Sequence, residues 1–136
     1  MESLGTLFYD MGFMRYPLAF TVLVIFALTS YSTVQLYKPG AWADLRTKTF
    51  LDGILFWGVF ATITGVLGSL IGIVIAAQAI ERAGAVSGTL IEGGFKVAML
   101  TSIFGVLILA ASSLTWFGLQ LRWRLLQAKA ANENGD

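Results

Sequence analysis

The sequence predicts an all-α integral membrane protein in which a short amphipathic interfacial helix precedes three transmembrane helices. Of the 136 residues, 57% are hydrophobic and only 12% are charged, and the charged residues leave three long gaps. A soluble domain carries about 25% charged residues. Each gap exceeds the ~20 apolar residues that cross a hydrocarbon core of about 30 Å. Because backbone amides in lipid must be paired within the protein, each gap is expected to be a helix.

The charge-free gaps define the elements of a single membrane domain, 1–136. The transmembrane helices are predicted at 16–37, 53–80 and 97–121. Around them lie an interfacial segment (1–14), a short loop (38–52), a second loop (81–96) and a tail (122–136). Apolar residues along one helical face of the interfacial segment predict that it lies flat on the membrane. Its acidic residues argue against a signal peptide, which has a basic start.

Lysine and arginine are distributed unevenly around the predicted helices. Six of the nine lie in the 38–52 loop and the tail, and three lie in the N-terminal flank and the 81–96 loop. The more basic side of a membrane protein stays in the cytoplasm. The N-terminus is therefore expected to face outward and the tail to face the cytoplasm.

The composition argues against several classes of function. The chain has no Cys and no His, so it lacks the usual ligands of zinc and iron–sulfur clusters and the usual catalytic nucleophile and base. We therefore expect neither an enzyme nor a cofactor or metal site. The net charge of +1 gives no indication of nucleic-acid binding. No Asp, Glu, Lys, Arg or His lies within the three gaps, so a proton carrier at mid-membrane would have to come from another polypeptide.

The second and third predicted helices, unlike the first, present small and hydroxyl-bearing residues on their faces. The predicted helix-packing residues are Gly65, Gly68, Gly72 and Gly105. The hydroxyl-bearing candidates for an ion pathway are Thr62, Thr64, Ser69, Thr101 and Ser102. Small faces let helix backbones approach closely in lipid. The hydroxyls allow two interpretations: they hydrogen-bond to backbone and join the helices, or they line a pore with the first helix outside.

Residues 65–73 read GVLGSLIGI, and residues 98–106, in the following helix, read AMLTSIFGV. These segments resemble the G-L-L-G-T-V-x-G-I and A-L-x-T-T-x-x-G-L segments of the MotA/TolQ/ExbB proton-channel family. Residues 14–18, MRYPL, are similar to the short pattern ending in Pro before that family's first span. By this resemblance Ser69 takes the place of the pore Thr in one helix, and Thr101 and Ser102 that of the paired Thr in the next.

The resemblance implies a homopentameric ring in the bacterial inner membrane, with a periplasmic N-terminus and a cytoplasmic C-terminus. The ring would enclose single-span partners of the MotB, TolR or ExbD type, which supply a membrane Asp. Such a complex converts proton-motive force into mechanical work or energised transport. Val97 stands where many members carry Glu, so a ring of acids at the outer mouth is not expected. The 38–52 loop replaces the large cytoplasmic insertion with which flagellar members touch a rotor, so a flagellar role is not expected. The alternative is a structural or scaffold subunit of a larger inner-membrane complex.

Overall fold

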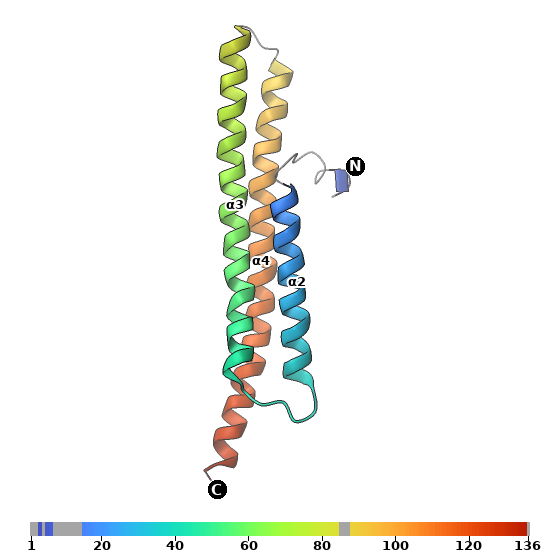
Figure 1. Cartoon of the computed structure of the whole chain (residues 1–136), viewed down its shortest axis with the longest axis vertical. Helices are drawn as coiled ribbons and strands as arrows, with labels where there is room; N and C mark the ends of the chain where they lie inside the picture. Colours follow the sequence, from blue (N-terminus) through green and yellow to red (C-terminus); the bar gives the residue numbers. More distant parts are fainter. Residues whose placement is uncertain (1–2, 4, 7–14, 85–87, 136) are drawn as a thin grey trace.

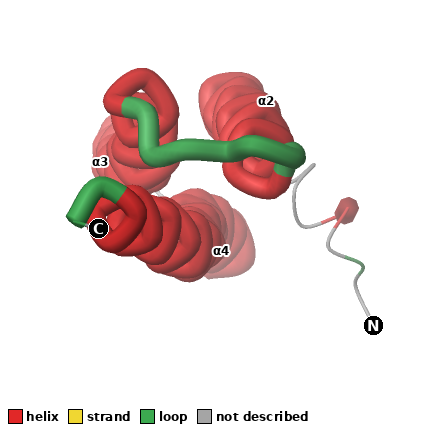
Figure 2. Tube along the Cα trace, turned by 90° about the horizontal axis from the view of Figure 1, so that it is seen from below, coloured by secondary structure: helices red, strands yellow, loops and turns green. Residues whose placement is uncertain are grey.

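The computed structural model describes residues 3, 5–6, 15–84 and 88–135 of the chain. Three long helices account for most of these residues: α2 (Arg15–Tyr37), α3 (Leu45–Ala83) and α4 (Gly88–Glu133). α3 and α4 form an antiparallel hairpin, and α2 packs along the half of this hairpin that lies away from its turn (Figure 1). Seen along the bundle, the three helices lie at the corners of a triangle (Figure 2).

Proline and glycine mark the helix ends. Pro17 lies in the first turn of α2, where its missing N–H removes no helical hydrogen bond. Pro39 and Gly40 follow the last turn of α2, and Gly40 has a φ of 76°, a left-handed conformation that favours glycine. α3 ends in the same way at Gly84, with a φ of 68°, whose N–H donates to the Ile80 carbonyl at 3.2 Å.

All three helices are long and apolar enough to cross a membrane, as the sequence predicted. α2 has 23 residues and is therefore about 34 Å long, close to the thickness of a hydrocarbon core. α3 and α4 have 39 and 46 residues, or about 58 and 69 Å, and run past the predicted spans 53–80 and 97–121. The chain is an integral membrane protein whose hairpin is longer than the bilayer core.

Helix replaces much of what was predicted as loop and tail. The 38–52 loop is reduced to 38–44, helix occupies most of 81–96, and α4 continues to Glu133 within the predicted tail. Charged residues indicate where a helix leaves the membrane, but they do not end the helix, because Lys, Arg, Glu and Gln are good helix formers. The predicted interfacial segment, 1–14, lies outside the described residues except for Ser3, Gly5 and Thr6, which establish no separate interfacial helix.

Two small buried clusters hold α2 against the hairpin. Leu36 packs with Leu51 and Leu119 near the 38–44 connection. Leu18 packs with Ala61 near the start of α2. Each cluster joins α2 to α3, and partly buried apolar side chains of α4 complete both.

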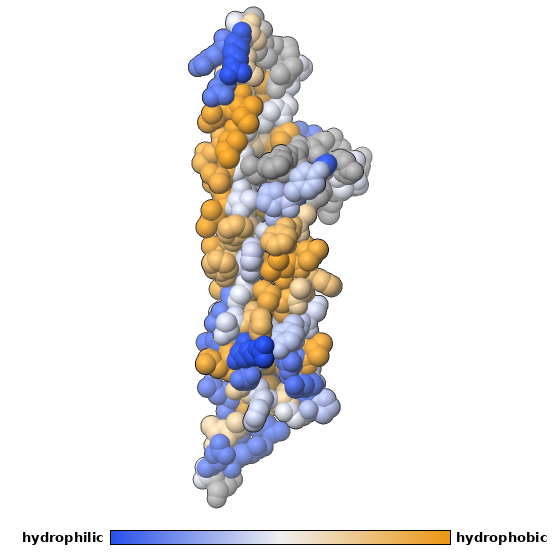
Figure 3. Space-filling view, viewed as in Figure 1, coloured by the Kyte–Doolittle hydropathy of each residue, from blue (hydrophilic) through white to orange (hydrophobic). Residues whose placement is uncertain are grey.

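Most large apolar side chains point away from the bundle. Phe26 is 73% exposed and Leu114 is 76% exposed, fractions that are typical of a surface in contact with lipid. Figure 3 shows hydrophobic side chains over the middle of the bundle and hydrophilic ones gathered towards both ends. Since lipid gives helices no hydrophobic reason to associate, the packing between them depends on close backbone contact.

α3 and α4 come into backbone contact at Gly65 and Gly105. A Cβ atom on Gly65 would lie 2.7 Å from the carbonyl oxygen of Thr101, and one on Gly105 would lie 2.8 Å from that of Ala61. Both distances are shorter than real Cβ contacts. Glycine is therefore required at both positions for the helices to keep this separation.

The remaining packing glycines contribute unequally. Gly68 is buried in α3, whereas a Cβ on Gly72 would meet Ala98 at an ordinary 3.8 Å. A further tight contact, absent from the predicted set, lies at Gly58, where a Cβ would be 2.7 Å from the Cβ of Ser112. Gly58 precedes Ala61 by three residues on the same helical face, so its spacing was a usable signal.

We predict that Gly65→Ala destabilises the hairpin by about 1–3 kcal/mol, because the added methyl group forces α3 and α4 apart. The matched control is Gly118→Ala in α4, where no atom lies within 4 Å of the added Cβ. This control should leave stability unchanged or raise it by about 0.5–1 kcal/mol. Denaturant-induced unfolding in detergent micelles measures both. Equal effects at the two positions would contradict the close contact.

Candidate functional site

The hydroxyl-bearing candidates gather where α3 and α4 face each other. We call this the α3–α4 seam: Gly58, Ala61, Thr62, Gly65 and Ser69 of α3, with Ala98, Thr101, Ser102, Gly105 and Ser112 of α4. The glycines bring the two backbones together, so the short Ser and Thr side chains of one helix reach the other. The chemistry of the seam therefore follows directly from its packing.

Ser69 and Ser102 meet at the end of the seam that lies nearer the turn of the hairpin. Their hydroxyl oxygens are 2.6 Å apart, although the residues are 33 positions apart in the chain. The Ser69 hydroxyl also lies within hydrogen-bonding distance of the Gly65 carbonyl, at 3.1 Å, and of the Ala98 carbonyl across the seam. A hydroxyl has one proton and two lone pairs, so Ser69 donates to one of these oxygens at a time. Its side chain is buried, whereas that of Ser102 is half-buried.

The threonines hydrogen-bond mainly to backbone. The Thr62 hydroxyl lies 3.1 Å from the Gly105 carbonyl across the seam and 3.3 Å from the Gly58 carbonyl of its own helix. Thr101 is almost completely buried and donates to the Val97 carbonyl at 2.9 Å. Thr64 is half-buried, and its side chain makes no hydrogen bond to another described residue.

The structure thus brings four of the five predicted pathway residues into one hydrogen-bonded seam and leaves Thr64 beside it. Within a single chain the Thr62, Ser69 and Ser102 hydroxyls join α3 to α4, and the Thr101 hydroxyl bonds within α4, which is the first of the two interpretations that the sequence allowed. Of the Ser69–Ser102 pair, Ser102 is the residue that retains partial exposure. An ion pathway along the seam would require water to reach Ser102 and to exchange with its contact to Ser69.

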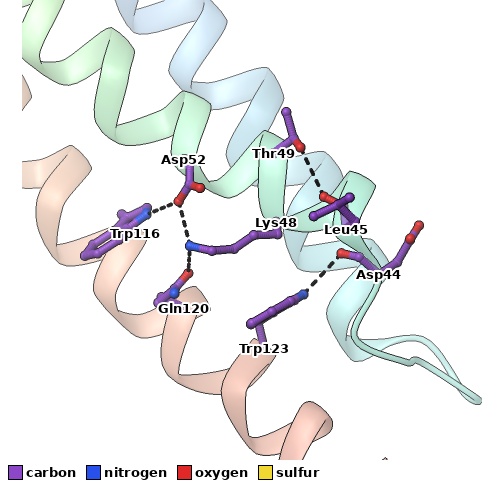
Figure 4. Close-up of polar contacts among 8 residues, drawn as sticks. All are labelled: Asp44, Leu45, Lys48, Thr49, Asp52, Trp116, Gln120 and Trp123. Atoms are coloured by element: carbon purple, nitrogen blue, oxygen red, sulfur yellow. Dashed lines mark hydrogen bonds and ion pairs between the residues drawn. The ribbon is translucent and has the colours of Figure 1, made fainter.

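A second polar cluster joins the start of α3 to the C-terminal half of α4 (Figure 4). The Lys48 ammonium lies 2.7 Å from an Asp52 carboxylate oxygen and 2.8 Å from the Gln120 side-chain oxygen. The Trp116 indole donates to the same Asp52 oxygen at 3.2 Å, and Trp123 donates to the Asp44 backbone carbonyl at 3.2 Å.

The Lys48 ammonium is further held by aromatic faces. It lies 5.7 Å from the centre of the Trp116 ring and 5.8 Å from that of Trp123, within the range of cation–π attraction. This cluster was missed from the sequence because residues 45–52 were assigned to a loop. The four-residue spacing of Lys48 and Asp52 is the signal that a helical assignment would have used.

No group of three or more His, Cys, Asp or Glu side chains in the described part of the chain is arranged to hold a metal ion. Lys48 and Asp52 form an ion pair at one end of the hairpin. The α3–α4 seam itself consists of close backbone packing and hydrogen bonds between two helices.

No known protein family, curated protein or solved structure matches the chain. The features that bear on function are therefore the geometry of the seam, the distribution of charge and the sequences of residues 65–73 and 98–106.

We predict that the Ser69–Ser102 contact stabilises the hairpin and that a double-mutant cycle of Ser69→Ala and Ser102→Ala measures it. The expected coupling is about 0.6 kcal/mol, the mean for hydrogen bonds between membrane helices, and at most about 1.7 kcal/mol. Thr115→Ala is the matched control, because its hydroxyl bonds only to the Ala111 carbonyl of its own helix among the described residues. A cycle of Ser69→Ala with Thr115→Ala should give no coupling. Additive effects for the serine pair would argue against their contact.

Proposed function

We propose that the chain is the wall subunit of a membrane proton channel, and that several copies form a ring around a partner helix. The observation that carries this proposal is the contact between Ser69 and Ser102, with hydroxyl oxygens 2.6 Å apart. It joins the two segments, 65–73 and 98–106, that resemble the MotA/TolQ/ExbB family. A pore wall made of two adjacent helices requires such segments to lie at the same depth.

The distribution of charge supports a partner that carries the proton. The middle parts of α2, α3 and α4 contain no Asp, Glu, Lys, Arg or His, so the chain offers no such group that could carry a proton at mid-membrane. Hydroxyl side chains can order water around such a group but cannot replace it. The proposed partner is a single-span protein of the MotB, TolR or ExbD type with an Asp in its membrane helix.

The arrangement of the helices supports a ring. α2 packs on one side of the hairpin and leaves the other faces of α3 and α4 uncovered (Figures 1 and 2). Five copies with α2 outermost would place the hairpins next to the partner helices. We further propose the bacterial inner membrane, with the basic end of the bundle, near the 38–44 connection, in the cytoplasm.

A scaffold subunit is the second candidate, and one observation favours it. The Thr62 and Ser69 hydroxyls already lie within hydrogen-bonding distance of backbone carbonyls of α4, a use that needs no ion. A scaffold would hold a larger complex together through the exposed apolar faces of the hairpin. It would not require Ser102 to remain accessible to water.

The test is proton flux through the complex purified from its own host by a tag on this chain and placed in liposomes. We expect Ser102→Val to lower the flux at least tenfold, because it removes the accessible hydroxyl of the seam, while native mass spectrometry finds five copies of the chain and two of the partner. Thr33→Val is the control, because its hydroxyl lies on α2 and bonds to the Thr29 carbonyl.

Normal flux through both Ser102→Val and Ser69→Val assemblies would exclude a pore along the seam. A complex that contains no Asp-bearing single-span protein and conducts no protons would favour the scaffold.

A further inference from the structure

A polar cavity of about 160 Å³ lies beside the 38–44 connection, between the end of α2 and the start of α3. Two basic side chains, Lys38 and Arg46, line it together with the polar side chains of Gln35 and Thr47. Neither basic residue makes an ion pair with another described residue. Two cations that lack an ion-pair partner among the described residues and lie beside a small polar cavity can bind an anion there.

The start of α3 adds backbone donors to this cavity. The first N–H groups of a helix have no partner within the helix, and a side chain at the N-cap usually accepts one of them. Asp44 occupies the N-cap but makes no side-chain hydrogen bond there. Because Arg46 and Thr47 of the first turn line the cavity, the positive end of the α3 dipole lies beside it.

Thr47 gives an independent indication of a ligand. The residue is only 7% exposed, yet its hydroxyl makes no hydrogen bond to any described residue. The Thr47 Oγ1 atom is not completely buried, unlike the unpaired Ser32 Oγ and Arg122 Nε, so it retains access to its surroundings. Because Thr47 lines the cavity, a ligand oxygen there can accept a hydrogen bond from this hydroxyl.

Asp44 also lines the cavity, and its carboxylate opposes an anion. It forms no ion pair with Lys38 or Arg46. The two cations therefore outweigh its single negative charge, and the helix end adds further positive potential. The lining keeps a net positive charge.

We propose that this cavity binds the phosphate group of an anionic phospholipid at the membrane surface. A phosphate group fits the cavity because the two cations, the N-terminus of α3 and the Thr47 hydroxyl are all suited to bind phosphate oxygens. The phosphate is assigned to a membrane lipid because of where the cavity lies. The cavity is at one end of the apolar band, and its lining includes Trp42, which is 76% exposed. Exposed tryptophan is typical of the headgroup level. The proposal is independent of the proton-channel function.

The test is native mass spectrometry of the full chain in detergent, titrated with phosphatidylglycerol, with diacylglycerol as the probe that lacks the phosphate. Phosphatidylglycerol should bind, and the double variant Lys38→Gln/Arg46→Gln should weaken this binding roughly 25-fold, at about fivefold for each cation. Thr47→Val should weaken the binding of phosphatidylglycerol roughly fivefold. Asp44→Asn should strengthen the binding of phosphatidylglycerol, because it removes the carboxylate that repels the phosphate.

Arg124→Gln is the matched control, since Arg124 is an exposed cation at the same end of the bundle that does not line the cavity. Circular dichroism confirms that each variant keeps its helices. Inorganic phosphate distinguishes the source: weak competition supports a lipid headgroup, whereas displacement of the lipid at equal concentration shows a phosphate site filled from solution. Equal losses for the Arg124 control and the cavity variants, or equal binding of diacylglycerol, would overturn the proposal.

Discussion

The contact between the backbones of α3 and α4 at Gly65 and Gly105 determines much of the remaining structure. With no Cβ atom at either position, the helices lie close enough for the Ser69 hydroxyl to reach both Ser102 and the Ala98 carbonyl. In lipid, where burial of apolar surface gives helices no reason to associate, such packing and hydrogen bonding supply the attraction. The hairpin in turn presents the surface on which Leu18 and other apolar residues of α2 pack.

The polar ends of the bundle complement this apolar middle. Lys48 donates to both Asp52 and Gln120 next to two tryptophans, so α3 and α4 are joined by an ammonium and by indole hydrogen bonds where the apolar band ends. The proposed phosphate cavity lies at the same end of α3. One helix terminus thus combines contacts that hold the hairpin together with groups suited to the membrane surface, and neither use needs an ionisable group inside the bilayer.

The sequence predicts well whatever depends on hydrophobicity and short periodicity. The three apolar helices and the ends of α2 follow from the charge-free gaps and from Pro39, and Gly65 and Gly105 lie on predicted small-residue faces. The register between α3 and α4 depends on contacts between residues far apart in the chain, so the Gly58–Ser112 contact and the bond from Lys48 to Gln120 were not predicted. The acceptor of each hydroxyl is likewise a tertiary property, since a short Ser or Thr side chain reaches backbone of either helix.

The seam forms between α3 and α4 of one chain, and a disulfide between positions 69 and 102 tests this directly. The chain has no Cys, so Ser69→Cys/Ser102→Cys introduces the sole pair of thiols. Mild oxidation in the native membrane should link them within one chain, because their side-chain oxygens are 2.6 Å apart. Ser69→Cys/Ser113→Cys, whose second thiol lies about 16 Å further along α4, should stay reduced. Crosslinks between chains, or free thiols in both variants, would contradict the seam.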